Sequence, residues 1–310
     1  MLKVVARTGE DELAEVFVAE LADGARIEFA ESVQPPYPRE EKWVLIVSTL
    51  KGCPVKCPIC DAGGDYRGTL SAEEIIAQVE YLVRRRYPDG RALVRRLKVQ
   101  FARMGDPALN DAVLEALVEL PRRLDLPGLM PSISTVAPAG REKFFTRLLE
   151  IKRELYGRDR FQMQFSIHTT DAVARRALIP IRTMGFAEIA AYGDRFFIPD
   201  DRKITLNFAP AAGVPLDPVA LLDHFSPDRY LVKLTPINPT LAASGAGLLG
   251  LIDPLDKPAA ERIADLFRRC GYETILSIGE LRENAIGSNC GMYVTRLGGQ
   301  EIVATRARMG

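Results

Sequence analysis

Residues 43–64, WVLIVSTLKGCPVKCPICDAGG, decide the fold and the chemistry of this 310-residue chain. The segment opens with WVLIVS (43–48), an unbroken apolar run of the kind that forms a buried strand. Cys53, Cys57 and Cys60 follow within eight positions, in the spacing Cys-x-x-x-Cys-x-x-Cys. A strand that runs directly into such a loop presents three thiols together at its carboxyl end.

Outward from this loop, apolar strand-like runs alternate with amphipathic helix-like segments. Further strands are expected at 97–102, 129–135, 161–168, 203–210, 230–237 and 272–277. Helices are expected at 71–85, 110–124, 141–155, 170–178, 217–225 and 257–271. Ser71 and Glu74 form a capping box at the start of the first helix, and Pro121 is expected to end the second.

This alternation predicts an α/β fold with a parallel sheet and right-handed crossovers. Six or more strand–helix units indicate a full or partial β/α barrel, and we expect the partial (β/α)6 form. Such barrels carry their chemistry at the carboxyl ends of the strands, where the cysteine loop lies.

The amino-terminal region has a different pattern. Two alternating runs within 13–31 are joined by Ala22-Asp23-Gly24, a strong hairpin signal, and the proline-rich stretch 34–38 follows as a linker. We therefore expect a hairpin extension over 1–40, a barrel core over 41–296 and a tail over 297–310.

The composition is that of a soluble globular protein, with 47% hydrophobic and 26% charged residues. Lys plus Arg equals Asp plus Glu at 41 each, which argues against a large RNA substrate, although a local basic patch at 84–86 or 95–96 stays open. Exposed helix ends and turns are the simpler interpretation of both runs. The polar amino terminus and the lack of a long apolar run predict a cytoplasmic protein without a membrane segment.

Three thiolates on one short loop can bind three irons of a [4Fe–4S] cubane and leave the fourth iron open. The alternative, a structural zinc knuckle, needs a fourth ligand, and His168, His224, Cys270 and Cys290 are all distant in sequence. The spacing is typical of radical S-adenosylmethionine (SAM) enzymes, in which SAM fills the open site and is cleaved to a 5′-deoxyadenosyl radical. Ile59 stands at the apolar position that such enzymes use against the adenine.

Most of the chain, from about residue 13 to 296, resembles the RlmN and Cfr family of ribosomal RNA adenine methyltransferases. Seven segments carry the resemblance in order: 47–60 (VSTLKG and the cysteine loop), 104–110 (MGDPALN), 133–136 (ISTV), 165–168 (FSIH), 178–181 (LIPI), 237–239 (INP) and 282–291 (RENAIGSNCG).

The resemblance implies a set of SAM contacts. Gly105, Asp106 and Pro107 would line the amino group of SAM. Ser134, Ser166 and Asn238 would contact its ribose, carboxylate or sulfonium region, although each could instead be an ordinary loop cap. His168 can be interpreted as a buried imidazole with an internal partner.

Cys290 is the most consequential residue that the resemblance implies. In the family this cysteine receives a methyl group from one SAM, and the radical from a second SAM attacks that methyl before it joins the substrate. The alternative role for Cys290 is that of a small buried apolar side chain.

Two departures from the family pattern bear on the substrate. Ile46 stands seven residues before Cys53, where the family has its second catalytic cysteine, and Cys270 is expected at the opposite rim. The family's amino-terminal RNA-binding helical domain has no counterpart here. We therefore expect a small-molecule, nucleoside-like substrate, an external electron donor of the flavodoxin or ferredoxin type, and no RNA. An RNA adenine methyltransferase and a non-enzymatic zinc- or RNA-binding module are the alternatives.

Overall fold

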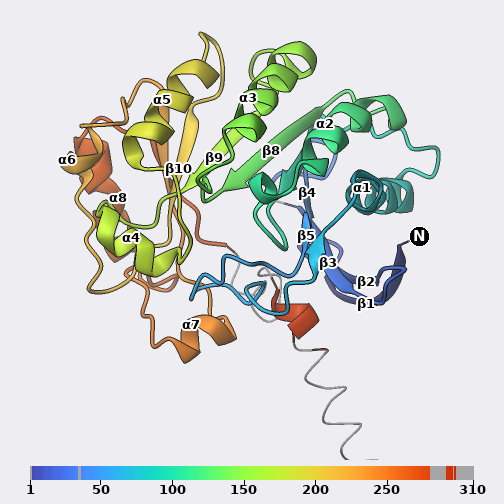
Figure 1. Ribbon diagram of the computed structural model, residues 1–310, viewed down its shortest axis with the longest axis horizontal. Coiled ribbons are helices and arrows are strands. Elements are labelled where there is room, and N and C mark those ends of the chain that lie inside the picture. The colour runs from blue at the N-terminus through green and yellow to red at the C-terminus, as the bar shows by residue number, and fades with distance from the viewer. Residues whose placement is uncertain (1, 34–35, 280–290, 296, 298–310) are drawn as a thin grey trace, which may run out of the picture.

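The computed structural model describes residues 2–33, 36–279, 291–295 and 297. One ten-stranded sheet, in the order β1-β2-β3-β4-β7-β8-β9-β10-β11-β12, forms the centre of the molecule (Figure 1). Its strands are β1 (Lys3–Glu10), β2 (Ala14–Glu20), β3 (Arg26–Val33), β4 (Lys42–Val47), β7 (Arg96–Phe101), β8 (Leu129–Thr135), β9 (Gln162–Ser166), β10 (Ile204–Phe208), β11 (Tyr230–Leu234) and β12 (Thr274–Leu276). The helices are α1 (Ala72–Arg86), α2 (Ala112–Arg123), α3 (Glu142–Ile151), α4 (Ala172–Leu178), α5 (Phe186–Phe196), α6 (Pro218–Leu221), α7 (Leu241–Gly245) and α8 (Lys257–Arg269), with short turns η1 (Pro107–Leu109) and η2 (Lys152–Tyr156).

The amino-terminal strands pair antiparallel and join the sheet through β4. The expected hairpin is present as β2 and β3, with Asp23 accepting from the Ala25 amide at 3.0 Å in the turn. The structure adds β1 at the sheet edge, which the sequence analysis did not foresee. Its side chains are all at least partly exposed, so it lacks the apolar alternation that marks a half-buried strand.

The seven strands from β4 to β12 are parallel and follow one another in chain order. Right-handed crossovers in unbroken order place the connecting helices on one face, and Figure 1 shows them around the outside of the sheet. The α/β class is confirmed. The barrel is not confirmed. In the described chain the seven expected parallel strands are present, but the sheet is not closed, since its edge strands β1 and β12 do not pair with each other.

The helices start largely where the sequence indicates. The capping box of Ser71 and Glu74 is confirmed at α1. The prediction that Pro121 ends α2 is wrong, because α2 continues to Arg123. Proline cannot donate to the carbonyl four residues earlier, and the Tyr156 hydroxyl donates to that carbonyl, of Leu117, instead.

Two helices occupy segments that the sequence analysis left as loops. α5 begins after Gly185, whose amide donates to the Glu188 carboxylate at 2.7 Å. α7 begins after Thr240, whose hydroxyl accepts from the Ala243 amide at 3.0 Å. No helix in the described ranges is long and apolar enough to cross a membrane.

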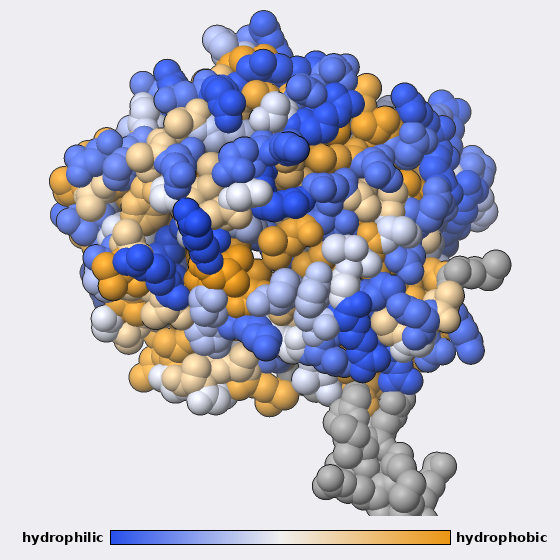
Figure 2. Space-filling model, in the orientation of Figure 1, coloured by the Kyte–Doolittle hydropathy of each residue, from blue (hydrophilic) through white to orange (hydrophobic). Residues whose placement is uncertain are grey.

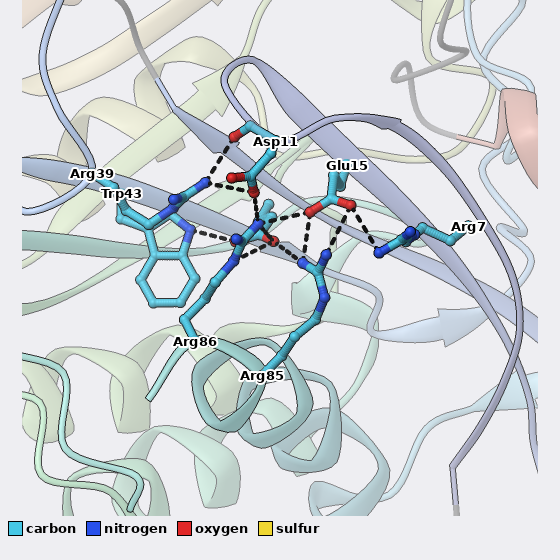
Figure 3. Close-up of polar contacts among 8 residues, drawn as sticks. Arg7, Asp11, Glu15, Arg39, Trp43, Arg85 and Arg86 are labelled. Carbon is cyan, nitrogen blue, oxygen red and sulfur yellow. Dashed lines mark hydrogen bonds and ion pairs between the residues drawn. The ribbon is translucent and has the colours of Figure 1, made fainter. Parts of the chain in front are cut away.

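A network of arginines and carboxylates, the arginine–carboxylate network, fastens the amino-terminal strands to α1 (Figure 3). Glu15 on β2 and Glu31 on β3 have side chains only 6% and 2% exposed. Arg85 donates to both carboxylates at 2.6 Å, and Arg86 reaches them at 2.7 and 2.8 Å. The network is completed by Arg7, Asp11, Arg39 and Trp43. The expectation that the run 84–86 is merely an exposed helix end is therefore wrong for Arg85 and Arg86.

Candidate active site

The cysteine loop leaves the carboxyl end of β4 and lies between the short paired strands β5 (Leu50–Lys51) and β6 (Gly68–Thr69). Cys53, Cys57 and Cys60 are all free and partly exposed. Burial raises the pKa of the Cys53 thiol, and hydrogen bonds from the backbone amides of Val55, Lys56 and Asp106 oppose that rise. Amide donors of this kind stabilise a thiolate and tune the metal cluster that it binds.

Apolar side chains surround two of the three thiols. Cys53 and Cys57 pack against a small apolar cluster of Val55, Val136, Leu178 and Ile179. Burial raises the pKa of Cys57 to about 12, and the charges of Cys53 and Asp106 add to the effect. Burial likewise raises the pKa of Cys53. The loop therefore places Cys53 and Cys57 against apolar side chains, near the Asp106 carboxylate.

The described residues contain no group of three or more His, Cys, Asp or Glu side chains placed to hold a metal ion. Three thiolates that each bind a different iron of a cubane stand further apart than ligands of one metal ion. The thiols, the amide donors to Cys53 and the apolar wall suit such a cluster.

The segment 105–107 reaches the cysteine loop as expected, but its carboxylate is used differently. Gly105 has φ of 90°, and a Cβ there would approach the Leu50 side chain to 2.3 Å. The Asp106 carboxylate accepts from the Ala108 amide at 2.9 Å, the Thr135 hydroxyl at 2.7 Å and the Val136 amide at 2.6 Å. Burial raises the Asp106 pKa to about 6. This carboxylate ties 104–110 to the end of β8, and its acceptor sites are filled within the fold.

The serines expected to contact SAM lie on neighbouring strands. Ser134 accepts from the Gln164 amide group at 2.8 Å, and Ser166 is the last residue of β9. Asn207 of β10 is aligned with Ser166 on one side and Lys233 of β11 on the other. Both serines thus reach the carboxyl edge of the sheet that carries the cysteine loop.

Asn238 and Ile59 are brought close together by the chain around α7. The Thr240 hydroxyl donates to the Ile59 carbonyl at 3.2 Å. Asp61 accepts from the Leu241 and Ala242 amides at 3.1 and 2.8 Å, which caps the start of α7. The sequence analysis missed Asp61 and Thr240, although Thr240 and its following small residues carry an N-cap pattern.

Arg175 of α4 is a further residue that the sequence analysis missed. It donates to the carbonyls of Val136 and Ser166 at 2.9 and 3.2 Å and to Thr183 at 2.8 Å. Its Nε is buried without a partner among the described residues. Burial lowers its pKa to about 10, and the nearby Cys57 raises it. The charge of Arg175 lowers the pKa of Cys57 and so opposes the effect of burial. Its hydrogen bonds to Val136 and Ser166 also hold the ends of β8 and β9 together.

His168, next to this cluster, behaves as expected. It is buried, and its Nδ1 accepts from the Ala209 amide at 3.1 Å. Burial lowers its pKa to about 4, with Arg175 adding to the effect, so the ring is neutral at pH 7.

Glu28 of β3 connects the amino-terminal strands to the chain that follows Cys290. Cys290 itself, and 282–290 of its motif, lie outside the described residues. Gly291 and Val294 donate their amides to the Glu28 carboxylate, Val294 at 3.1 Å. Arg103 pairs with the same carboxylate at 2.8 Å. Gly291 has φ of 82°, and a Cβ there would meet the Ala62 backbone at 2.2 Å. The residue after Cys290 thus packs directly against the cysteine loop.

Ile46, which replaces the family's second cysteine, and Cys270, the spare thiol, lie in different parts of the fold. Ile46 lies on β4, aligned with Ala30 of β3 and Gln100 of β7. Cys270 follows the last residue of α8. Helices of this fold run antiparallel to the strands, so Cys270 lies toward the amino ends of the strands, away from the cysteine loop.

Comparisons with known proteins point to one group of enzymes. No protein-family model matches the chain. A protein of Heliobacterium modesticaldum named as a dual-specificity RNA methyltransferase RlmN is 27% identical, covering 96% of this chain and 73% of that protein. Proteins of the same name from two Synechococcus strains, RCC307 and CC9311, are 28% and 32% identical, each covering 65% of this chain. This chain spans only 58% of the length of these last two relatives.

Solved structures share the fold of this chain. A radical SAM methyltransferase from Sphaerobacter thermophilus superposes with a TM-score of 0.74 at 23% identity, over 94% of this chain and 80% of that chain. A spore photoproduct lyase complexed with dinucleoside spore photoproduct matches at a TM-score of 0.50 and 14% identity, over 76% of each chain. At these identities the similarity concerns the fold.

Proposed function

We propose, from the premise that this chain belongs to the RlmN-like radical SAM family, that Cys53, Cys57 and Cys60 bind a [4Fe–4S] cluster at which SAM is cleaved. Radical SAM methyltransferases are enzymes that use this pair of cofactors, and this chain is an enzyme of that kind. The observation that carries the assignment of ligands is the cysteine loop, with three free thiols and amide donors on Cys53.

When bound, the cluster supplies an electron that breaks a carbon–sulfur bond of SAM and so provides a 5′-deoxyadenosyl radical. The chain supplies the surroundings. Val136, Leu178 and Ile179 form an apolar wall against Cys53 and Cys57. Arg175 contributes a fixed positive charge beside Cys57. Ile59, Ser134, Ser166, Asn238 and the backbone of 105–107 would line the SAM molecule.

Cys290 is proposed as the residue that carries the methyl group or otherwise takes part in the radical chemistry. Support comes from its neighbour, because Gly291 is fixed against Ala62 and Glu28 next to the cysteine loop. If this is right, Cys290→Ala retains SAM cleavage and loses product. Normal turnover by that variant would make Cys290 a structural residue.

A small, nucleoside-like molecule is the substrate that we propose. Ile46 replaces the family's second cysteine, and its side chain can act neither as a base nor as a nucleophile. Product release in this chain therefore cannot follow the family's disulfide route. The zero net charge of the chain also gives little general attraction for a long RNA.

The second candidate is methylation of RNA, which the names of the relatives favour. Three relatives are named as dual-specificity RNA methyltransferases, and this weighs against our expectation that RNA is excluded. Loss of a methyladenosine from the RNA of a deletion strain, seen by mass spectrometry, would establish this candidate and overturn the small-molecule proposal.

The cofactor assignment is tested by iron and sulfide analysis after anaerobic reconstitution. We expect about four irons per chain, as one [4Fe–4S] cluster contains. Cys53→Ala should lose the cluster and the formation of 5′-deoxyadenosine, whereas Cys270→Ala should retain both. A full iron content in Cys53→Ala would refute the ligand assignment. An external donor of the flavodoxin or ferredoxin type and a cytoplasmic location complete the proposal, since both the free thiols and the cluster require reducing conditions.

A further inference from the structure

The inner face of the curved parallel sheet, opposite the helices, is unusually polar. Along each strand, side chains alternate between the helix side and the inner face. The helix side carries the apolar core, for example Val99, Phe165 and Leu206. The alternate positions hold Lys42 on β4, Lys98 and Gln100 on β7, Ser132 and Ser134 on β8, Gln162 and Gln164 on β9, Thr205 and Asn207 on β10, and Lys233 on β11.

Three of these polar residues are buried and the others, Lys98 and Lys233 among them, are half-buried, although the connecting helices lie on the other face. Ser132, Thr205 and Gln164 are only 0%, 1% and 5% exposed. Curvature of the sheet explains this, because it turns the strands toward one another, and Figure 2 shows a hollow near the middle of the molecule. In a flat sheet, four strand spacings would separate β7 from β11 by about 19 Å. The charge of Lys233 nevertheless contributes to the lowered pKa of Lys98, which indicates that the two ammonium groups lie within electrostatic range of each other across the inner face.

Positive charge on this inner face has no negative counterpart. The inward positions of the described strands from β4 to β11 include no Asp or Glu. No ion pair in the described chain involves Lys42, Lys98 or Lys233. Burial lowers the pKa of Lys98 to about 7, and Lys233, Lys42 and Arg202 add to the effect. Burial lowers the pKa of Lys233 as well. Within the described part of the chain, Arg202 does pair with a carboxylate, that of Asp159 at 3.1 Å.

Hydrogen-bonding groups on the same face are also left over. The Ser132 hydroxyl and the Asn207 carbonyl oxygen are buried without a partner in the described residues. The side-chain amides of the two glutamines do have partners on this face. Gln164 donates to Ser134 at 2.8 Å, and Gln162 donates to Thr205 at 3.3 Å. A buried fold normally satisfies such atoms, and unsatisfied ones indicate a missing ligand or water.

We propose that the inner face binds the phosphate group of the substrate between Lys98 and Lys233, with Ser132 and Asn207 completing its hydrogen bonds. That the phosphate belongs to the substrate rests on the proposed function, whereas the anion site itself does not depend on it. Lysine is a common phosphate ligand, and a dianion would supply the negative countercharge that the two half-buried ammonium groups lack.

The position of the site defines the size of the ligand. Lys98 lies three residues below the last residue of β7, which places it about 10 Å from the carboxyl edge. Lys233 is one residue from the end of β11 and is aligned with Asn207 and, through it, with Ser166. A molecule of nucleotide length would therefore reach Lys98 with its phosphate while its other end remained at the cysteine loop.

The test measures anion binding to the purified full-length chain by calorimetry, with sulfate, phosphate, AMP and adenosine as probes. We expect saturable binding of sulfate, phosphate and AMP. Lys98→Gln and Lys233→Gln should weaken it by about tenfold or more, which corresponds to ~1.4 kcal/mol. Lys143→Gln, at an exposed position on α3, is the matched control and should bind like the parent chain. Adenosine binding should not respond to any of these changes.

Sulfate separates the charge of the protein from that of the ligand, because sulfate does not titrate near neutral pH. Its binding should tighten as the pH falls through about 7, where Lys98 gains its proton. This dependence of sulfate binding on pH should be absent in Lys98→Met. Thermal unfolding of the same variant shows whether the chain folds without the Lys98 charge.

Absence of saturable binding by the parent chain, or equal binding by the parent and Lys98→Gln, would overturn the proposal. A loss of SAM affinity in Lys98→Gln with unchanged phosphate binding would also overturn it. None of these measurements needs the cluster, so a failed anion site leaves the radical SAM function standing. A failed cluster assay leaves the anion site standing.

Discussion

Two regions of this molecule bury charged side chains in opposite ways. In the arginine–carboxylate network, Glu15 and Glu31 each face the guanidinium groups of Arg85 and Arg86 (Figure 3). On the inner face of the sheet, the charge of Lys233 lowers the pKa of Lys98, and neither lysine forms an ion pair with a carboxylate in the described part of the chain. The network is complete within the chain, whereas the inner face is not.

The difference separates charges that hold the fold together from charges that await a ligand. Removing one partner of a buried, completed pair leaves the other charge unpaired and costs stability. Removing a buried cation that has no partner should have the opposite sign, because its desolvation is not compensated in the free protein. The following substitutions test this contrast.

The largest effect is expected at Glu28, a completed pair inside the candidate site. Glu28→Gln should lower the free energy of unfolding by about 4 kcal/mol, because Arg103 would lose the charge of its buried carboxylate. Urea denaturation measures the change. Adding Arg103→Met should recover a large part of the loss; a double variant as unstable as the single one would show that the pairing is not the cause.

A somewhat smaller loss is expected in the arginine–carboxylate network. Glu31→Gln should cost about 3 kcal/mol, since two guanidinium groups and the Trp43 indole would lose a charged partner. The shift of the urea midpoint at a constant slope is the measurement. If Glu31→Gln lowered the free energy of unfolding by less than the loss of an exposed ion pair does, the network would not stabilise the fold as a buried one.

On the inner face, Lys98→Met should raise the free energy of unfolding by about 1 kcal/mol at pH 7. The folded pKa is about 7, and an unfolded lysine titrates near 10.4. Between these values the unfolded chain binds a proton that the folded chain lacks, so stability rises with pH in this window. The gain from Lys98→Met should therefore be greatest at pH 7 and below and vanish toward pH 10. A destabilised Lys98→Met, or a gain independent of pH, would contradict an unpaired ammonium.

The smallest effect is expected at an exposed pair. Arg122 and Glu119 lie 2.7 Å apart on α2, with side chains 65% and 41% exposed. Arg122→Ala should change the free energy of unfolding by less than about 0.5 kcal/mol, because solvent screens the pair. A loss as large as that of Glu31→Gln would remove the distinction between buried and exposed pairs on which the comparison depends.

Local patterns predicted the parallel strands and the α1 capping box well, because apolar alternation and capping are local properties. The course of α2 past Pro121 could not be foreseen, since the donor that replaces the proline amide is Tyr156, far along the chain. Strand β1 was not predicted because it buries no row of apolar side chains.

The site divides in the same way. The cysteine spacing was readable, but Asp106 gave no sign that its carboxylate would be filled by Thr135 and Val136. The local sequence carried no signal of a functional role for Lys98. Its relation to Lys233, far along the chain, appears only in the folded structure, where the charge of Lys233 contributes to the lowered pKa of Lys98.

The contact of Glu28 with Gly291 has a consequence for biosynthesis. The two residues are 263 positions apart, and Gly291 packs on the loop that contains Cys60. Ribosomes add roughly 5–20 residues per second, so the cysteine loop waits about 10 to 50 s for the segment that covers it. During translation the cysteine loop is therefore complete well before the segment that packs on it, and this interval would be available for assembling the proposed cluster on its thiols.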